Sequence, residues 1–241
     1  DTTAMQVDPV QPTTLAVVTL DAAGERSFSF YRNPGADTML RAEEVPQAIL
    51  ESTKFFHFGS VSLTADPERT ATLDAVHRAK KAGALITFDP NYRANLWPDA
   101  KNAVAQIQAA LPLADILKVS DEEMTLLTGC TDPQEGSLRL MALGIPLVLI
   151  TLGADGACYR MGDCYGKVNG FAVKVADTNG AGDTFLGAFL SRIKERESLS
   201  ELDDAKLREA VTFANKAASL TTSRPGAIPA MPTLQEVSAG E

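Results

Sequence analysis

Short apolar segments alternate with helical patterns through the middle of this 241-residue chain. The apolar segments are typical of buried β-strands, and the segments between them carry apolar residues at the spacing of one helix face. The predicted strands are 54–58, 84–88, 115–119 and 146–151, and the predicted helices between them are 66–83, 99–110 and 132–144. Repeated strand–helix units of this kind predict an α/β fold with a mostly parallel sheet flanked by helices.

The chain begins and ends with further predicted elements. Residues 15–20 and 26–31 favour two strands joined by a turn that contains Gly24, which predicts an antiparallel hairpin. Because this hairpin precedes the first predicted helix, we expect a small sheet attached to the main domain. More strand material is expected within 157–176, and two helices are expected around 183–195 and 204–221.

The composition excludes several classes of function. The chain has 22 basic and 31 acidic residues, and a net charge of −9 argues against nucleic acid as a partner. No apolar run approaches the ~20 residues that cross a bilayer, so no membrane partner is expected. Three cysteines without a C-x-x-C pair and only two histidines provide little for a zinc site or a catalytic triad. We expect reduced thiols and a cytoplasmic protein.

A glycine-rich loop is the strongest chemical signal in the chain. Gly180, Ala181 and Gly182 follow strand material, and the helical spacing of Phe185 and Phe189 places them at the start of a helix. The first N–H groups of a helix have no partner within it and the helix dipole is positive there, so this position suits an anion. Small side chains also let a phosphoryl group approach the backbone closely.

Asp183 follows this loop directly and has two interpretations. A carboxylate in the first turn of a helix is most often a stabilising group at the helix N-terminus. Behind an anion cradle, however, the same carboxylate is placed to accept a proton from a hydroxyl group that attacks the phosphate. A weak base suffices there, because phosphoryl transfer depends mainly on positioning and on stabilising charge.

Two other phosphate-binding motifs are excluded. The P-loop pattern G-x-x-x-x-G-K-[ST] occurs nowhere in the chain. Gly180 and Gly182 are followed by Gly187, which is two residues too far for the dinucleotide fingerprint G-x-G-x-x-G.

The run Asp-Thr-Asn-Gly-Ala-Gly-Asp-Thr-Phe at 177–185 resembles the C-terminal signature of the ribokinase-like (pfkB) carbohydrate kinases. Phe-Tyr-Arg-Asn-Pro at 30–34 and Gly-Ala-Ile-Pro-Ala-Met-Pro at 226–232 are closest to fructokinases. The resemblance covers essentially the whole chain, through further agreeing stretches in the same order at 56–60, 89–93, 118–123 and 151–156.

The resemblance implies ATP as the phosphate donor and assigns roles to residues of this chain. Asp183 matches the catalytic base, and Gly180, Ala181 and Gly182 match the anion hole for the transferred phosphate. The positions that match nucleotide-binding residues of the family are Thr151, Gly153, Gly156, Asn215, Gly226 and Ala227, of which Asn215 falls where the family contacts adenine.

Metal ions are also implied by the resemblance. Glu123 matches the glutamate of the family's N-x-x-E motif, which organises Mg2+ through water, although Ser120 replaces the asparagine as it does in fructokinases. Asp177 and the backbone of Asn179 match a monovalent-cation site beside the anion hole. K+ is therefore a candidate for this site, and the sequence leaves open whether activity depends on it.

Two arginines match family positions that reach the sugar or its phosphate. Arg32 ends the predicted hairpin and Arg93 follows a predicted strand. Without the resemblance both are more simply surface arginines in weak ion pairs, and with it we expect both to contact the substrate. For Lys118, contact with phosphate and a structural role at a strand end are equally good interpretations.

The resemblance divides the chain into a partial β lid and entry segment at 1–45 and an α/β nucleotide-binding and catalytic domain at 46–241. The family's opening strand, with its Gly-Glu/Asp signature and Gly-Gly-x-x-x-Asn loop, has no counterpart here. If Asp1 is the true terminus, nucleotide binding is expected to survive while sugar phosphorylation is strongly reduced. The hairpin is expected to act as a lid, with a homodimer through it as an option.

The function implied is ATP-dependent phosphorylation of a sugar primary hydroxyl, with fructose converted to fructose 6-phosphate as the first choice. Two alternatives stay open at this point. The acceptor can be 2-keto-3-deoxygluconate, whose kinases share the Tyr-Arg and Asp-x-Asn-x-Arg patterns seen here at 31–32 and 89–93. The chain can also be a non-catalytic, kinase-like protein that binds a nucleotide.

Overall fold

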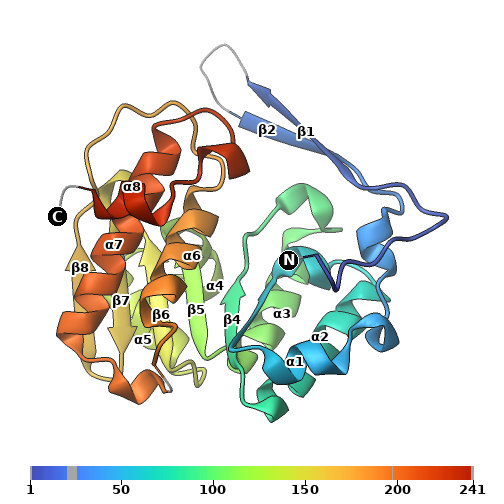
Figure 1. The fold of residues 1–241 in the computed structure, drawn as a ribbon, viewed down its shortest axis with the longest axis horizontal. Coiled ribbons are helices and arrows are strands. Elements are labelled where there is room, and N and C mark those ends of the chain that lie inside the picture. The colour runs from blue at the N-terminus through green and yellow to red at the C-terminus, as the bar shows by residue number, and fades with distance from the viewer. Residues whose placement is uncertain (1, 21–25, 197, 240–241) are drawn as a thin grey trace. The chain divides into compact units, whose positions relative to one another are not determined.

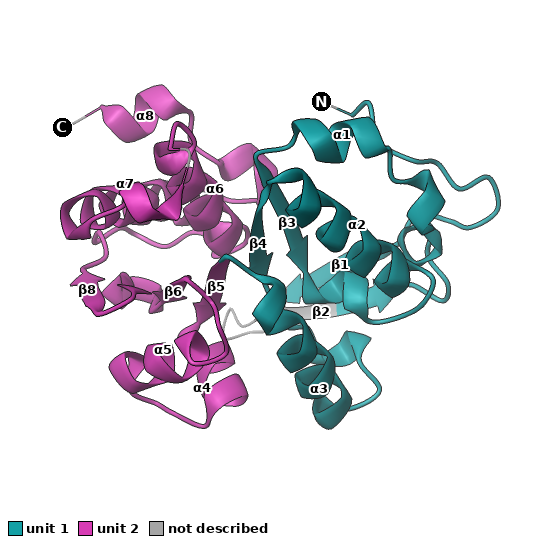
Figure 2. Ribbon diagram, turned by 90° about the horizontal axis from the view of Figure 1, so that it is seen from below, with its two compact units in different colours: residues 1–115 teal, residues 116–241 magenta. Residues whose placement is uncertain are grey.

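The structure is a computed structural model that describes residues 2–20, 26–196 and 198–239. The chain forms two compact units, Asp1–Asp115 and Ile116–Glu241, which Figure 2 distinguishes by colour. The α/β organisation predicted from the sequence is confirmed within each unit, because strands alternate with helices in both.

The first unit contains two pairs of strands. The predicted hairpin is confirmed, since β1 (Leu15–Leu20) pairs antiparallel with β2 (Arg26–Tyr31), with Leu15 opposite Tyr31 (blue in Figure 1). The turn predicted at Gly24 lies outside the described residues. The second pair, β3 (Phe55–Gly59) and β4 (Leu85–Asp89), is parallel. The helices of this unit are α1 (Gln47–Ser52), α2 (Glu68–Ala82) and α3 (Ala100–Ala110).

Local signals explain where the helices of the first unit begin and end. The Asp99 side chain accepts a hydrogen bond from the backbone N–H of Asn102 and so caps the start of α3. Gly83 ends α2 in the left-handed region with a φ of 98°, which a residue without a Cβ adopts without strain. Ala71, Ala75 and Ala79 recur at helical spacing on the buried face of α2.

The second unit holds four consecutive strands. They are β5 (Ile116–Ser120), β6 (Leu147–Thr151), β7 (Ala157–Met161) and β8 (Cys164–Val168). β5 and β6 are parallel, whereas β7 pairs antiparallel with both β6 and β8. The helices are α4 (Asp121–Thr128), α5 (Pro133–Met141), α6 (Ala181–Ile193), α7 (Asp204–Thr222) and α8 (Leu234–Ser238). In Figure 2, α6 and α7 lie on one side of these strands, and α4 and α5 lie on the other.

Some elements differ from the sequence prediction. Strand structure in the 157–176 region ends at Val168, and the segment 169–176 forms no strand. The short helices α1, α4 and α8 were not predicted, because five to eight residues are too few for a periodic pattern. Short 3₁₀ turns lie at 36–39, 42–44, 60–63, 94–96, 111–113, 153–155, 199–201 and 228–230.

The described part of the chain bears on two expectations, one about the cysteines and one about membrane-spanning segments. Cys130, Cys158 and Cys164 are all free thiols, and the first two are buried. Among the described residues, no helix combines the length and the apolar character that crossing a bilayer requires.

Candidate active site

A pocket of about 490 Å3 in the second unit gathers many of the predicted nucleotide-binding residues. Its wall combines the turn after β6, the segment that follows β8, the start of α6 and one face of α7. The predicted residues that line it are Thr151, Gly153, Gly156, Ala181, Gly182 and Asn215. Residues separated by up to 64 positions in the sequence therefore meet at one concave surface.

One wall of the pocket depends on close backbone packing. Gly156 has a φ of 93°, and a Cβ on it would lie 2.1 Å from the carbonyl oxygen of Val168. A Cβ on Gly170 would in turn lie 2.2 Å from the carbonyl oxygen of Ala154. Because backbone atoms cannot move aside easily, both positions require glycine, and the glycines shape this part of the pocket.

The helix α7 contributes a face of small residues. Ala218, Ser219 and Thr222 follow Asn215 at intervals of three, four and seven positions, so all four lie on one side of the helix. Of these, only Asn215 was predicted. The signal was present in the sequence, as small or polar residues at helical spacing where a core-facing helix normally carries larger apolar ones.

The segment after β8 was missed as well. The pocket is also lined by Gly170, Phe171, Ala172, Val173 and Val175, with Thr178 and Phe185 nearby. Phe171 and Val175 are 40% and 60% exposed. The alternation of apolar residues in this stretch favoured a strand, whereas the structure uses it as an apolar pocket wall.

Asn215 is buried and its amide is held in one orientation. Its Nδ2 donates hydrogen bonds to the carbonyl oxygens of Val168, at 3.2 Å, and Asn169, at 3.3 Å. The opposite orientation would place Oδ1 against two other oxygens, which is unfavourable. The polar atom that Asn215 offers a ligand is therefore the acceptor Oδ1.

The glycine-rich loop has the geometry that the sequence predicts. Gly180 precedes α6 in the left-handed region with a φ of 74°, and Ala181 begins the helix. Thr184 donates its backbone N–H to the Gly180 carbonyl at 2.8 Å, and Ala181 donates its own to the Thr178 carbonyl at the longer distance of 3.4 Å. The first N–H groups of a helix have no carbonyl one turn earlier to which they can donate, so they point out of the helix end. This arrangement is suited to an anion.

Asp177 connects this loop to the one that follows α7. One carboxylate oxygen accepts the backbone N–H of Asn179 at 2.6 Å, and the other accepts that of Gly226 at 3.0 Å. Ala227 lies close by, since its Cα and Cβ are 3.5 Å from the position that a Cβ on Gly180 would occupy. The predicted residues of the two loops are therefore neighbours.

Asp183 lies in the first turn of α6 and is exposed. It is the next residue after Gly182, which lines the pocket, but among the described residues Asp183 is not part of the pocket lining. The carboxylate is thus placed at the end of the anion cradle and reaches solvent, where an incoming hydroxyl group can approach.

Glu123, which was predicted to organise Mg2+, also stabilises the start of a helix. Glu123 and Ser120 form a reciprocal cap at the start of α4: Ser120 N–H donates to Glu123 Oε2 at 2.9 Å, and Glu123 N–H donates to Ser120 Oγ at 3.1 Å. This cap fixes the Glu123 carboxylate. Within residues 2–20, 26–196 and 198–239, no group of three or more His, Cys, Asp or Glu side chains is arranged to hold a metal ion.

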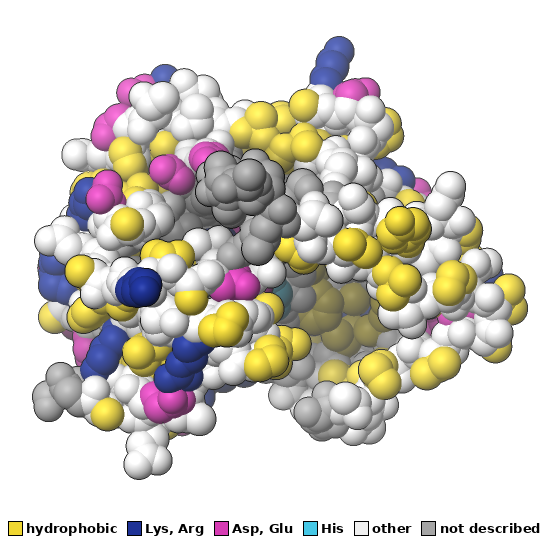
Figure 3. All heavy atoms as spheres, turned by 90° about the horizontal axis from the view of Figure 1, so that it is seen from above, with side chains coloured by type: hydrophobic (Ala, Val, Ile, Leu, Met, Phe, Trp, Pro, Cys, Tyr) yellow, Lys and Arg dark blue, Asp and Glu magenta, His cyan; other side chains and the backbone are white. Residues whose placement is uncertain are grey.

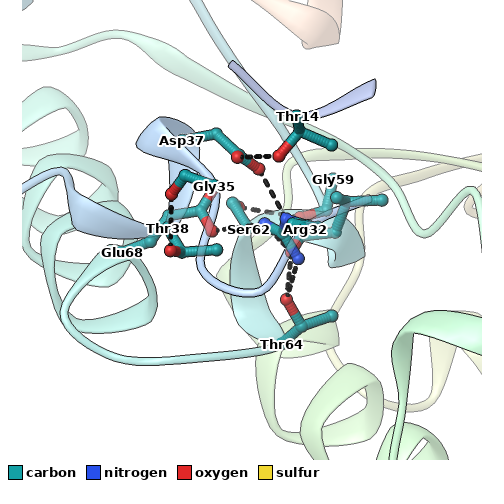
Figure 4. A network of polar contacts seen from close by, with 10 residues as sticks. Thr14, Arg32, Gly35, Asp37, Thr38, Gly59, Ser62, Thr64 and Glu68 are labelled. Carbon is teal, nitrogen blue, oxygen red and sulfur yellow. Dashed lines mark hydrogen bonds and ion pairs between the residues drawn. The ribbon is translucent and has the colours of Figure 1, made fainter. Parts of the chain in front are cut away.

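Arg32, in the first unit, is the centre of a polar network that Figure 4 shows. Its Nε donates to Asp37 at 2.6 Å, its Nη1 donates to Thr64 at 2.6 Å, and its Nη2 donates to Glu68 at 2.7 Å and to the Val61 carbonyl at 3.4 Å. Only 6% of the side chain is exposed. The network holds the end of β2 against α2.

The carboxyl group of Glu68 is unusual within this network. Burial and the nearby charge of Asp37 raise the pKa of Glu68 while the Arg32 guanidinium lowers it, and together these effects raise the pKa to about 7. The largest contribution is desolvation, because the side chain is only 10% exposed.

The two predicted substrate arginines have different surroundings. Arg32 lines a shallow pocket of about 560 Å3 together with Phe30, Thr64 and Asn95. Arg93 is half-buried, and its Nη1 donates to the Tyr92 carbonyl at 3.1 Å. Arg93 does not line this pocket among the described residues, although the turn that follows it does.

Comparison with known proteins identifies relatives over nearly the whole chain. The family model described as "pfkB family carbohydrate kinase" matches residues 1–234. Fructokinase-2 of Solanum lycopersicum is 45% identical over 225 residues, which is 93% of this chain and 68% of the tomato protein.

Solved structures agree with the sequence relatives. The fructokinase of Vibrio cholerae O395, solved with fructose, ADP and a calcium ion, superposes with a TM-score of 0.85 at 37% identity, over 95% of this chain and 73% of that one. The fructokinase of Xylella fastidiosa with bound ATP gives a TM-score of 0.87 at 35% identity, again over 95% and 73% of the two chains. The predicted ribokinase-like fold class is thereby confirmed.

Proposed function

The chain belongs to the pfkB family of carbohydrate kinases, and from this membership we propose that it transfers the terminal phosphoryl group of ATP to a sugar. The proposed acceptor is fructose, with fructose 6-phosphate as product. Relatives named fructokinase at about 45% identity support this choice, as does the fructose-bound Vibrio enzyme. They do not favour the alternative acceptor, 2-keto-3-deoxygluconate.

The observation that carries the proposal is the pocket at the start of α6. Six predicted nucleotide-binding or anion-hole residues line it, and its walls are glycine-rich on one side and apolar on the other. An apolar pocket accommodates the adenine base of a nucleotide, while backbone N–H groups at a helix start bind phosphate. In this proposal Thr151, Gly153, Gly156 and Asn215 bind the nucleotide.

The reaction itself is assigned to the loop and its aspartate. The N–H groups of Gly180, Ala181 and Gly182 would bind the transferred phosphate, and Gly226 and Ala227 would border the nucleotide. Asp183 would accept the proton of the sugar hydroxyl as the oxygen of that hydroxyl bonds to phosphorus. The exposed position of Asp183 beside the cradle supports this role.

Metal binding is proposed from the donor groups. The Glu123 carboxylate, fixed by Ser120, is the type of hard oxygen donor that suits Mg2+ through water. Bound magnesium would neutralise phosphate charge. Asp177 and the Asn179 backbone are proposed to hold a monovalent cation such as K+, and their oxygen atoms fit this class of ion.

Arg32 and Arg93 form the sugar side of the proposal. A guanidinium carries five N–H groups, and Arg32 forms four hydrogen bonds to the described residues. Within this part of the chain, one N–H on Nη1 remains for a ligand. The network around Arg32 fixes its orientation, which favours recognition of a hydroxyl or phosphate oxygen in the adjacent pocket.

Further parts of the proposal concern organisation. We assign residues 1–45 to a lid and entry segment and 46–241 to nucleotide binding and catalysis. A homodimer through β1 and β2 is proposed because Leu15, Val17 and Tyr31 are exposed there. Free thiols favour a reducing compartment, and we propose the cytoplasm.

The test is an ADP-release assay with fructose, 2-keto-3-deoxygluconate, glucose and ribose, combined with calorimetry of ATP binding. We expect ATP to bind and fructose to give the highest kcat/KM. Faster turnover with 2-keto-3-deoxygluconate would contradict the choice of acceptor. ATP binding without turnover of any sugar would favour the non-catalytic alternative.

A further inference from the structure

Lys118 is a charged residue in an otherwise apolar strand. It lies in the middle of β5, whose sequence is Ile-Leu-Lys-Val-Ser, and it is only 6% exposed. Side chains alternate along a strand, so Lys118 points to the same face as Ser120. Lysines are almost never buried in this way without a specific reason.

The ammonium group of Lys118 lies beside Gly182. A Cβ built on Gly182 would lie 2.9 Å from Lys118 Nζ and 3.5 Å from Lys118 Cε. The ammonium therefore occupies the space in which residue 182 would carry a side chain. Since Cα–Cβ bonds of a helix tilt toward its N-terminus, this space lies beside the first turn of α6.

We propose that Lys118 is a catalytic residue that binds the transferred phosphoryl group of the nucleotide from beneath Gly182. This inference rests on the proposed function, which it extends by one residue. The ammonium group of Lys118 would donate hydrogen bonds to phosphoryl oxygens. The hydroxyl proton would pass to Asp183, as the bond from the acceptor oxygen to the γ-phosphorus forms and the bond from that phosphorus to the bridging oxygen breaks.

Because the protein as a whole is negatively charged, a buried positive charge near the cradle is important for binding a polyphosphate. The net charge is −9, and acidic and basic side chains lie interspersed on the face shown in Figure 3. The attraction of a polyphosphate must therefore come from a local arrangement. The start of α6 provides about half a positive charge, and Lys118 adds a full charge next to it. Burial reduces screening by water and strengthens this interaction.

The proposal also explains the glycine at position 182. Gly182 is a helical residue without positive φ, so the helix itself does not require glycine there. Gly187 in the same helix has open space around its Cα, whereas Gly182 faces the lysine. A side chain at 182 would displace the ammonium and cover the N–H groups of the cradle.

The test compares nucleotides with and without the γ-phosphate. Calorimetry would measure the binding of ADP and of the non-hydrolysable β,γ-imido analogue of ATP to the wild type and to Lys118→Met. We expect the analogue to lose about 10- to 100-fold in affinity, as for a lost hydrogen bond to a charged group, and ADP to lose much less. We also expect kcat with fructose to fall about 100-fold or more.

Two matched controls separate this role from a structural one. Lys194→Met removes the same charge just beyond the far end of α6, where the side chain is 62% exposed, and should leave both affinities unchanged. Gly182→Ala should lower affinity for the analogue more than for ADP, because it displaces the ammonium while keeping the charge. Gly187→Ala, in open space, should not.

Each outcome has a definite meaning. Equal losses for ADP and the analogue, or an unchanged kcat, in a folded Lys118→Met protein would overturn the assignment of Lys118 alone. If Lys118→Met does not fold, Lys118→Gln and Gly182→Ala provide the same comparison, and an unchanged ratio of the two affinities in both would overturn the assignment. A wild type that binds neither nucleotide would overturn the proposed function and this inference together.

Discussion

The carboxylate of Asp177 accepts a hydrogen bond from the backbone N–H of Gly226 at 3.0 Å. Its other oxygen accepts the N–H of Asn179 at 2.6 Å, so one side chain connects the loop before α6 to the loop after α7. The Thr222 carbonyl reinforces the connection by accepting the N–H groups of Ala176 and Asp177. The cradle and the second nucleotide loop are thus coupled mechanically.

Replacing Asp177 by Asn should weaken this connection. An amide retains one acceptor, but its NH2 group would face a backbone N–H, and hydrogen bonds to a charged group contribute about 1.5–3 kcal/mol. We expect ATP affinity to fall about tenfold or more and any effect of K+ on turnover to disappear, as measured by calorimetry and by assays with and without K+. Asp163→Asn, on an exposed turn, is the control. Unchanged affinity would show that the two loops hold their positions without Asp177.

Replacing Asp183 by Asn tests the proposed base. Loss of a general base typically lowers kcat by about 10²- to 10⁴-fold. We expect this loss with little change in ATP affinity, since Asp183 is not part of the pocket lining among the described residues. Glu135→Gln is a matched control, because it also neutralises a carboxylate in the first turn of a helix, α5. If both variants keep near-normal kcat, Asp183 is only a stabilising group at the helix start.

Gly156→Ala should damage the pocket through the backbone. The added Cβ would lie 2.1 Å from the Val168 carbonyl oxygen, at a φ of 93°. We expect a loss of more than about 2 kcal/mol in the free energy of unfolding together with weakened ATP binding. Gly162→Ala provides the comparison: its φ is also positive, but nothing lies within 4 Å, so only about 1 kcal/mol of strain is expected. Urea unfolding of both variants measures the difference.

Asn215→Asp tests the amide that holds the segment after β8. The substitution replaces two N–H donors by an oxygen that faces the carbonyl groups of Val168 and Asn169. Leaving such groups unpaired costs about 1–3 kcal/mol, so we expect a lower melting temperature and at least tenfold weaker ATP binding. Asn102→Asp, exposed on α3, should change neither. Equal behaviour of the two variants would exclude a role for Asn215 in shaping the pocket.

The sequence predicted the local turns of the second unit better than the shape of its pocket. The glycine loop and the helix start at Ala181 could be predicted, because such local structure depends on residues that are neighbours in the chain. The apolar wall at 170–175 was taken for strand, since its alternation is the same in both cases. Whether apolar residues face a core or a pocket depends on distant partners such as α7, which a local pattern does not contain.

The surroundings of individual side chains were the least predictable. Arg32 was predicted to contact the substrate. Its hydrogen bonds to Thr64 and Glu68 were not predicted, because they join segments more than 30 residues apart. For Glu68, the sequence predicted only a place near the start of the helix at 66–83. Its buried position and raised pKa follow from the packing of α2 against the end of β2, which the sequence alone does not show.

Glu68 leads to a prediction about pH. Its pKa is raised from 4.5 to about 7 in the folded protein, so between these values the folded state holds a proton that the unfolded state has lost. The contribution of Glu68 to stability is therefore present below about pH 4.5 and is lost as pH rises through about 7, by at most about 3 kcal/mol.

Glu68→Gln should remove this dependence, because the amide does not titrate. We expect the free energy of unfolding of the variant, relative to that of the wild type, to increase from pH 5 to pH 8, so that the variant becomes relatively more stable, as measured by urea unfolding at both values. Glu43→Gln, which changes an exposed carboxyl group in the turn at 42–44, should show no such change. A relative stability of Glu68→Gln that falls as pH rises would mean that the pair with Arg32 outweighs burial, and that Glu68 is ionised at neutral pH.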